Sequence, residues 1–379
     1  MRGTEVSRVR ARGEDVRKYL VDNVENYPAD IAKRAAEHFG ITRQAVNKHI
    51  RRLIAEKIIT QAGKTRSRSY KLCATTQWSK SYSIQPGLSE GDVWRADVAP
   101  VLGDMPENVK DIWHYGFTEM FNNAIDHSGG TRITVDIEKT AAYTQMNIID
   151  NGVGIFKKIQ SALGLVDARH AVLELAKGKL TTDPARHSGE GIFFTSRMFD
   201  AFQILSSGVF YSHNFGSEEE WILEASQGAS TLVFMRLHNH TARTLRKIFD
   251  QYTSDDDFRF DKTVVPVELA QYGDDKLVSR SQAKRLLARV ELFKSVYFDF
   301  ENVATVGQAF ADEIFRVFAQ QHPDIEFVVI HANSEVKRMI ERVKHGALPS
   351  EAGSPSQRSL PGIDAPPLDS PRRGDENNQ

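Results

Sequence analysis

The stretch "FTEMFNNAIDHSGG", residues 117–130, places two asparagines, two acids and a histidine inside a pattern that otherwise predicts a helix. Its apolar residues recur at the spacing of a buried helical stripe: Phe117, Met120, Phe121, Ala124 and Ile125. Asparagine destabilises a helix interior by roughly 0.5 kcal/mol or more relative to alanine. Glu119 and Asn123 are four residues apart, so they share one helix face. The pair predicts either a binding site or a polar face that meets solvent.

Two glycine motifs follow this helix along the chain. "IIDNGVGI" (148–155) reads as a strand that ends in Asp-x-Gly-x-Gly, and "HSGEGI" (187–192) reads as a Gly-x-Gly that opens a helix. Each motif alone is typical of an ordinary turn. Their order is more informative, because a polar segment (156–188) lies between the two motifs in the place of a lid.

This combination resembles the GHKL ATP-binding superfamily, which includes gyrase, MutL and the histidine kinases, over residues 105–238. The Glu-x-x-x-Asn-Ala motif, with a histidine four residues after the asparagine, is most similar to that of the anti-sigma-factor serine kinases. The resemblance implies an α/β sandwich of the GHKL (Bergerat) type. It also implies ATP and Mg²⁺ as ligands.

The resemblance assigns roles residue by residue. Glu119 would be the catalytic general base, and Asn123 would coordinate Mg²⁺, which prefers oxygen ligands. Asp150 would accept a hydrogen bond from the adenine amino group, and Thr231 would lie beside the adenine. The remaining expected cofactor-binding residues are glycines that let the backbone approach the base or the phosphates at a helix N-terminus: Gly152, Gly154, Gly189 and Gly191.

Several nearby polar residues keep two interpretations. His127 matches the kinase pattern or caps the end of its helix. Arg186 and His187 reach a phosphate from the lid or are solvated, and Asn122 is interpreted as a surface residue. No histidine followed by an acid and a proline precedes the domain as a phosphoacceptor, which argues against a histidine autokinase.

The charge of the chain is distributed unevenly. The 379 residues carry a formal net charge of only −1. Residues 1–80 hold 18 Lys and Arg against 8 Asp and Glu, a net charge of +10, which leaves −11 for the other 299 residues. A basic head on an acidic body indicates that the head meets a polyanion.

The head, residues 1–75, reads as a winged helix-turn-helix. One helix stops at Gly40, and Thr42 can cap the next, "TRQAVNKHIRRLIAEKII". Two short strands around a basic tip follow. Exposed Arg, Asn and Gln on such a helix read bases in the major groove, and basic residues in a wing bind phosphates. The expected DNA-binding residues are Arg43, Gln44, Asn47, Lys48, Arg51, Lys64, Arg66 and Arg68. A winged helix used for protein contacts is the alternative.

Residues 258–345 alternate strands with helices, which predicts a small α/β domain. Around "SVYFDFENVATVGQAFADEIF" the sequence resembles the STAS-like domains found beside GHKL regulators, which implies a protein partner. In anti-sigma antagonists a loop after this strand offers a serine to the kinase. Here the loop has no serine, and Thr305 is its only hydroxyl, so phosphoryl transfer to this domain is not expected.

The remaining segments carry less information. Residues 76–105 read as a connector and 239–257 as a linker between the GHKL-like domain (106–238) and the STAS-like domain. The tail, 346–379, holds 6 of the 13 prolines and is expected to be disordered. A single cysteine and the lack of an 18-residue apolar run predict a cytoplasmic protein without a membrane contact.

The sequence as a whole predicts a multidomain, DNA-associated regulator in which an ATP–Mg²⁺ switch is coupled to a winged helix and a STAS-like interaction domain. The alternative is a serine/threonine protein kinase of the anti-sigma-factor type that acts on a separate partner. A third interpretation is a GHKL fold that binds nothing, against which the intact Glu119, Asn123 and Asp150 argue. The sequence leaves hydrolysis, phosphoryl transfer and a homodimer open.

Overall fold

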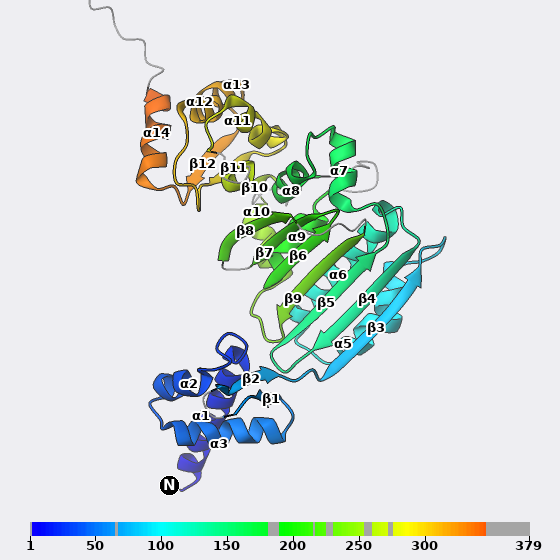
Figure 1. Cartoon of the computed structure of the whole chain (residues 1–379), viewed down its shortest axis with the longest axis vertical. Coiled ribbons are helices and arrows are strands. Elements are labelled where there is room, and N and C mark those ends of the chain that lie inside the picture. Colours follow the sequence, from blue (N-terminus) through cyan, green and yellow to red (C-terminus); the bar gives the residue numbers. More distant parts are fainter. Residues whose placement is uncertain are drawn as a thin grey trace, which may run out of the picture.

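The computed structural model describes residues 2–64, 67–180, 189–214, 217–224, 230–253, 260–271 and 276–345. The chain folds as a head unit (2–72), a central unit (76–253) and a C-terminal unit (260–345), which follow one another along its long axis (Figure 1). The tail that the sequence predicts to be disordered lies outside the described residues.

The head unit contains three helices and an antiparallel hairpin: α1 (Arg2–Asn23), α2 (Ile31–Phe39), α3 (Arg43–Ala55), β1 (Ile59–Ala62) and β2 (Ser69–Leu72). The predicted helix signals are confirmed. Gly40 ends α2 in the left-handed conformation, and the Thr42 hydroxyl accepts a hydrogen bond from the Ala45 amide at 3.2 Å. Val46, Ile50 and Leu53 place the inner face of α3 in a core that belongs to this unit alone.

The central unit is built on a seven-stranded antiparallel sheet in the order β3-β4-β5-β9-β6-β7-β8. Its strands are β3 (Thr76–Ser83), β4 (Arg132–Lys139), β5 (Tyr143–Asp150), β6 (Ala201–Ser206), β7 (Val209–Asn214), β8 (Ser217–Glu224) and β9 (Thr231–His238). Along β4, β5, β6 and β9 every second side chain is buried, as expected for a sheet covered on one face.

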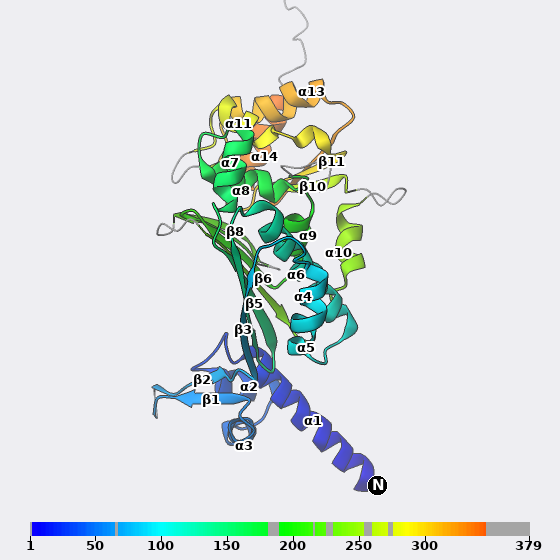
Figure 2. The ribbon, with the colours of Figure 1, turned by 90° about the vertical axis from the view of Figure 1, so that its right-hand side faces the viewer.

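Helices cover that face of the sheet, whereas none of the helices in the described part of the chain lies on the other face (Figure 2). They are α4 (Glu90–Val93), η2 (Trp94–Val98), α5 (Ala99–Leu102), α6 (Glu107–His127), α9 (Gly191–Met198) and α10 (Leu245–Tyr252). Trp113, Phe117 and Phe121 bury the inner face of α6. Two further helices, α7 (Ile155–Leu163) and α8 (Ala168–Lys177), lie at the end of the sheet that faces the C-terminal unit (Figure 1).

Two segments differ from the sequence prediction. The predicted connector, 76–105, contains β3, which pairs with β4 over eight residues, and the helices α4, η2 and α5. β3 is an edge strand in which only Tyr82 is fully buried, so its sequence lacks the apolar alternation of an inner strand. The predicted linker, 239–257, contains α10, whose Ile248 is buried against the central unit. The sequence analysis missed these elements because β3 and α10 are largely exposed and each buries one side chain fully.

The C-terminal unit is a parallel sheet, β10-β11-β12, with helices around it. Its elements are β10 (Lys262–Pro266), η3 (Val267–Ala270), α11 (Arg280–Leu287), η4 (Val290–Leu292), β11 (Ser295–Asp299), α12 (Gln308–Asp312), η5 (Glu313–Phe318), α13 (Ala319–Gln321), β12 (Glu326–Ile330) and α14 (Ser334–His345). The predicted α/β alternation is confirmed, although the sequence analysis missed β10. Unlike the head, this unit shares one continuous apolar core with the central unit.

The head unit contacts the end of β5 and β9 farthest from α7 and α8 (Figure 1). Glu25 accepts hydrogen bonds from the Leu72 amide and the Tyr143 hydroxyl, each at 3.2 Å, and lies 3.6 Å from Arg236. Burial, together with the charge of Glu25, raises the pKa of Tyr143 to about 12.

None of the helices within the described residues combines the length and the apolar character that crossing a bilayer requires.

Candidate functional site

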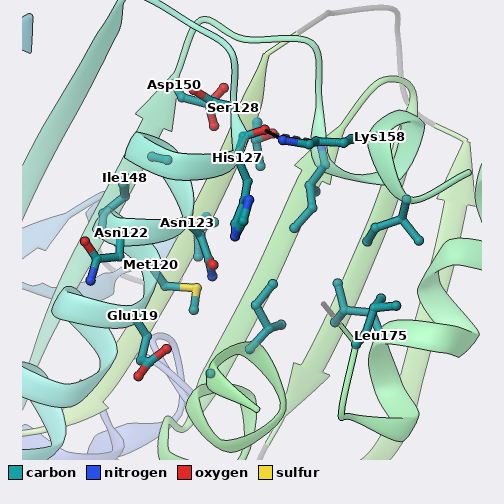
Figure 3. Close-up of a pocket in the computed structure, with 18 of the residues that line it drawn as sticks. Glu119, Met120, Asn122, Asn123, His127, Ser128, Ile148, Asp150, Lys158 and Leu175 are labelled. Carbon is teal, nitrogen blue, oxygen red and sulfur yellow. Dashed lines mark hydrogen bonds between the residues drawn. The ribbon is translucent and has the colours of Figure 1, made fainter. Parts of the chain in front are cut away.

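A cavity of about 270 Å³ lies between α6, the ends of β5 and β9, and the helices α7, α8 and α9 (Figure 3). Its lining includes six of the residues that the sequence analysis selected, drawn from four separate segments: Glu119, Asn123, Asp150, Gly189, Gly191 and Thr231. Apolar residues form the rest of the wall, including Ile148, Leu175 and Leu180. An apolar pocket with a few convergent polar groups is the usual form of a small-molecule site.

Asp150 and Thr231 define one end of the cavity. They are directly paired on β5 and β9, and their side chains are 6% and 5% exposed. The Asp150 carboxylate accepts the Gly152 amide at 2.8 Å. Burial raises the pKa of Asp150, and its hydrogen bonds with Gly152 and Thr231 oppose this shift. This end of the cavity therefore holds a buried hydrogen-bond acceptor.

Helix α6 supplies the polar groups along one side of the cavity. Glu119, Asn123 and His127 follow one another at intervals of four residues, and Figure 3 shows them in sequence along the helix face that borders the cavity. Asn122, interpreted from the sequence as a surface residue, is half-buried and contributes to the cavity lining as well. A helix face is about 100° wide, which allows two adjacent residues to border the same space.

Close backbone approach explains three of the four selected glycines. A β-carbon on Gly152 would lie 2.2 Å from the Ser128 carbonyl oxygen, and one on Gly191 would lie 2.0 Å from Glu119 Oε2. On Gly189 it would lie 2.5 Å from the Leu180 backbone. The Glu119 carboxylate thus occupies the space beside the N-terminus of α9, where the helix dipole favours negative charge.

Gly154, the fourth selected glycine, precedes α7, and two residues near the start of this helix were missed by the sequence analysis: Ser206 and Lys158. Gly154 has φ 89° and precedes α7, a conformation that favours glycine. The next amide, that of Ile155, donates to the Thr231 hydroxyl at 3.1 Å and to the Ser206 hydroxyl at 3.0 Å. Ser206 lies on β6 directly opposite Thr231 on β9, so only the pairing of these two strands identifies it. The Lys158 amine, also on the cavity wall, donates to the His127 carbonyl at 2.7 Å.

Tyr115 lies on α6 one turn before Glu119 and is affected by its charge. Burial, followed by the charges of Glu119 and Glu190, raises the pKa of the Tyr115 hydroxyl. Arg186 and His187, the two predicted lid residues, lie outside the described residues.

Most of the expected DNA-binding residues lie on α3 and the hairpin of the head unit. Arg43, Gln44, Lys48 and Arg51 are exposed and Asn47 is half-buried, while Lys64 and Arg68 are exposed beside the hairpin. Arg66 lies outside the described residues. Figures 1 and 2 place α3 on the side of the head unit that faces away from the central unit.

The C-terminal unit places Thr305 in an exposed loop before α12. At the carboxyl ends of β11 and β12, potential ligand atoms of Asp299, Glu301 and His331 lie within 4.8 Å of one another. The His331 ring is 3.0 Å from the Asp299 carboxylate, a contact that a hydrogen bond between the two side chains explains without a metal.

Comparison with known proteins identifies one segment of the chain. The family model of the STAS-like domain of unknown function (DUF4325) matches residues 282–337. The match spans α11 to the first part of α14, which confirms the predicted STAS-like character of that segment. No curated protein matches the chain.

Proposed function

We propose that the chain is an ATP–Mg²⁺-binding, DNA-associated regulator, in which a GHKL-type nucleotide switch joins a winged helix to a STAS-like interaction unit. The observation that carries this proposal is the convergence of Glu119, Asn123, Asp150 and Thr231 on one cavity together with a glycine-opened helix N-terminus. These residues are up to 112 positions apart in the sequence.

The Asp150 end of the cavity suits an adenine base. A carboxylate with one oxygen already accepting the Gly152 amide has further lone pairs for an exocyclic amino group. The Thr231 hydroxyl lies beside it on the paired strand, and Ile148 offers an apolar surface on the same wall. A base that presents a carbonyl in place of the amino group would face the Asp150 carboxylate, which only accepts hydrogen bonds, so the site would select adenine.

The opposite end suits phosphates. Gly189 and Gly191 bring the backbone at the N-terminus of α9 to the cavity wall beside Glu119, and such a terminus attracts anions. The Asn123 amide oxygen is a suitable ligand for Mg²⁺, which when bound would neutralise part of the phosphate charge. Glu119 lies beside Gly191, where its carboxylate can accept a proton from a water or hydroxyl nucleophile. Hydrolysis and transfer to a partner would use this same base.

Contacts with the head unit support coupling between nucleotide and DNA. Tyr143 and His238 are paired at one end of β5 and β9, and Asp150 and Thr231 are paired at the other end. Tyr143 donates to Glu25, and His238 lies 3.2 Å from Asp22. The two strands that bear the base-binding residues therefore also bear the surface on which the head unit rests. The exposed basic residues of α3 and the +10 charge of residues 1–80 support DNA as the ligand of the head.

The experiment that tests this function is calorimetric titration of the full chain with ATP, GTP and ADP, with Mg²⁺ or with EDTA. We expect ATP binding that requires Mg²⁺ for full affinity, and at least a tenfold loss in Asn123→Ala. Asn147→Ala is the matched control, because Asn147 lies on β5 and points to the uncovered face of the sheet. Equal affinity of Asn123→Ala and wild type, or no ATP binding, would refute the proposal.

γ-Labelled ATP with a Glu119→Ala control then separates the two enzymatic outcomes. Glu119-dependent free phosphate indicates an ATPase switch, whereas stable label on a protein indicates the kinase alternative. Binding with neither signal indicates a sensor that does not consume the nucleotide.

A further inference from the structure

Helix α8 lines the cavity on one side and contacts the C-terminal unit on the other. Leu175 on this helix lines the cavity, and three residues past its end Leu180 lines it as well. The Leu180 amide donates to the Gly189 carbonyl at 3.0 Å, which joins this segment to the glycines at the opening of α9. On its other side, α8 packs against β10 and η3 of the C-terminal unit. The wall of the cavity is therefore also an interface.

A buried ion pair holds this interface together. Lys177 is completely buried, and its amine lies 2.7 Å from the Glu174 carboxylate on the same helix. The amine also donates to the carbonyls of Ala288, at 2.7 Å, and Arg285, at 3.2 Å, both in the C-terminal unit. An ammonium group has three donors, so all of them find acceptors here, two of which the C-terminal unit supplies. A buried charge is tolerated only when it is satisfied in this way.

Arg289 of the C-terminal unit is the second element of this contact. Its guanidinium donates to the Glu174 carboxylate at 3.1 Å, to the Gly178 carbonyl at 3.0 Å and to the Lys179 carbonyl. The fixed fork of a guanidinium can bridge several acceptors that a point charge cannot. Arg289 thereby ties the end of α8 to the segment that follows it.

The backbone between α8 and Leu180 depends on the C-terminal unit for its hydrogen bonds. The Lys177 carbonyl accepts from the Thr263 hydroxyl at 2.7 Å, and the carbonyls of Gly178 and Lys179 accept from Arg289. Three consecutive carbonyls are thus satisfied by side chains of the C-terminal unit. Lys179 adds the reverse contact, because its amine donates to the Leu292 carbonyl at 2.8 Å.

We propose that the C-terminal unit completes the nucleotide site, with Arg289 as the positioning residue that fixes segment 177–180 and hence Leu175 and Leu180 on the cavity wall. This inference rests on the proposed function. Arg289 lines no part of the cavity and acts through the segment that it holds. Because coupling between two sites is reciprocal, a protein that binds the C-terminal unit and disturbs Arg289 weakens nucleotide binding, and bound nucleotide opposes that protein equally.

The test compares Arg289→Ala and Arg289→Lys in the full chain. We expect Arg289→Ala to weaken MgATP and MgADP binding at least tenfold, and Arg289→Lys to recover part of the loss because it keeps the charge toward Glu174. Arg280→Ala is the control: this arginine lies on α11 in the same unit, is mostly exposed and pairs with Asp312 at 3.5 Å. Its affinity should remain within twofold of wild type.

Hydrogen exchange of the same proteins without nucleotide reports the positioning role directly. Peptides covering residues 175–180 should exchange at least tenfold faster in Arg289→Ala, while peptides of β5 and β9 should be unchanged. Thr263→Val, which removes one hydrogen bond at nearly constant volume, should shift both readouts in the same direction by a smaller factor. It serves as the test if Arg289→Ala does not fold.

The outcomes separate the two proposals. A wild-type chain that binds no nucleotide overturns the proposed function, and with it this inference. A wild-type chain that binds nucleotide, together with an Arg289→Ala variant of equal affinity and unchanged exchange at 175–180, overturns the positioning role alone.

Discussion

Replacing Asp150 by asparagine is the most direct perturbation of the end of the cavity that we propose binds the base. The two side chains have nearly the same shape, so the change alters hydrogen bonding and charge rather than packing. In the wild type one carboxylate oxygen accepts the Gly152 amide at 2.8 Å. An asparagine that keeps this bond through its oxygen must present its NH₂ group to the ligand, where an adenine amino group also donates.

The expected loss follows from that mismatch. A hydrogen bond to a charged acceptor is worth about 1.5–3 kcal/mol, and 1.4 kcal/mol corresponds to a tenfold change in affinity. We therefore expect Asp150→Asn to weaken ATP binding roughly 10- to 150-fold. Inosine triphosphate, which carries a carbonyl in place of the amino group, should lose less affinity or gain it, because the new NH₂ group can donate to that carbonyl.

Calorimetric titration of both proteins with both nucleotides measures this discrimination. An ATP affinity within twofold of the wild type, with no change in the ratio of ATP to inosine triphosphate, would show that Asp150 does not contact the base. Thermal unfolding is the control, since loss of fold would lower the affinity for both nucleotides alike.

The pH dependence of stability offers a second readout of Asp150. Burial raises the pKa of Asp150 in the folded state above the ordinary value of 3.8. At a pH between 3.8 and this raised pKa, the folded state therefore binds a proton that the unfolded state has released. The free energy of unfolding contributed by Asp150 is therefore highest below pH 3.8 and falls as pH rises through the raised pKa. Asp150→Asn should remove this decline, which urea unfolding across that pH range would detect.

Two further perturbations test the glycine contacts and the head unit. Gly152→Ala places a methyl group 2.2 Å from the Ser128 carbonyl oxygen and should cost about 1–3 kcal/mol of stability in urea unfolding. Gly91→Ala, whose methyl group meets an ordinary 3.4 Å contact, should not. Arg43→Ala combined with Arg51→Ala should weaken duplex DNA binding and flatten its salt dependence, measured by fluorescence anisotropy. Arg95→Ala combined with Arg246→Ala, an equal charge loss at exposed arginines of the central unit, should leave both unchanged, and no difference between these variants would refute DNA binding through α3.

The central residues of the candidate site could be predicted from the sequence because they conflict with the secondary-structure preference of their own segments. Asn123 within an apolar helical stripe and two Gly-x-Gly motifs conflict with local preference, and such conflicts concentrate at functional sites. Ser206 escaped detection because its role depends on its register with Thr231, which only the sheet defines.

The interface escaped detection for a related reason. Glu174, Lys177 and Arg289 look like ordinary surface charges in the sequence, and only the packing of α8 against the C-terminal unit shows that the first two are buried and the third is half-buried. Strand β3 was missed because an edge strand needs to bury few of its side chains. Sequence reasoning thus located features set by local chemistry and missed those set by contacts between distant segments.

The two contacts of the central unit differ in how strongly they can transmit the state of the cavity. At the head unit, the side chains of Glu25 and Arg236 are 32% and 33% exposed, and exposed ion pairs contribute about 0–1 kcal/mol. Such a contact limits coupling to roughly fivefold. At the C-terminal unit, the ion pair that crosses the interface joins Arg289 to Glu174, whose side chains are 19% and 5% exposed, and breaking a buried pair costs up to about 3–5 kcal/mol. Because a ligand shifts an equilibrium only through its difference in affinity for the two states, nucleotide should influence the C-terminal unit and its protein partner far more than the head. Strong control of DNA binding would then require that partner to be the intermediary.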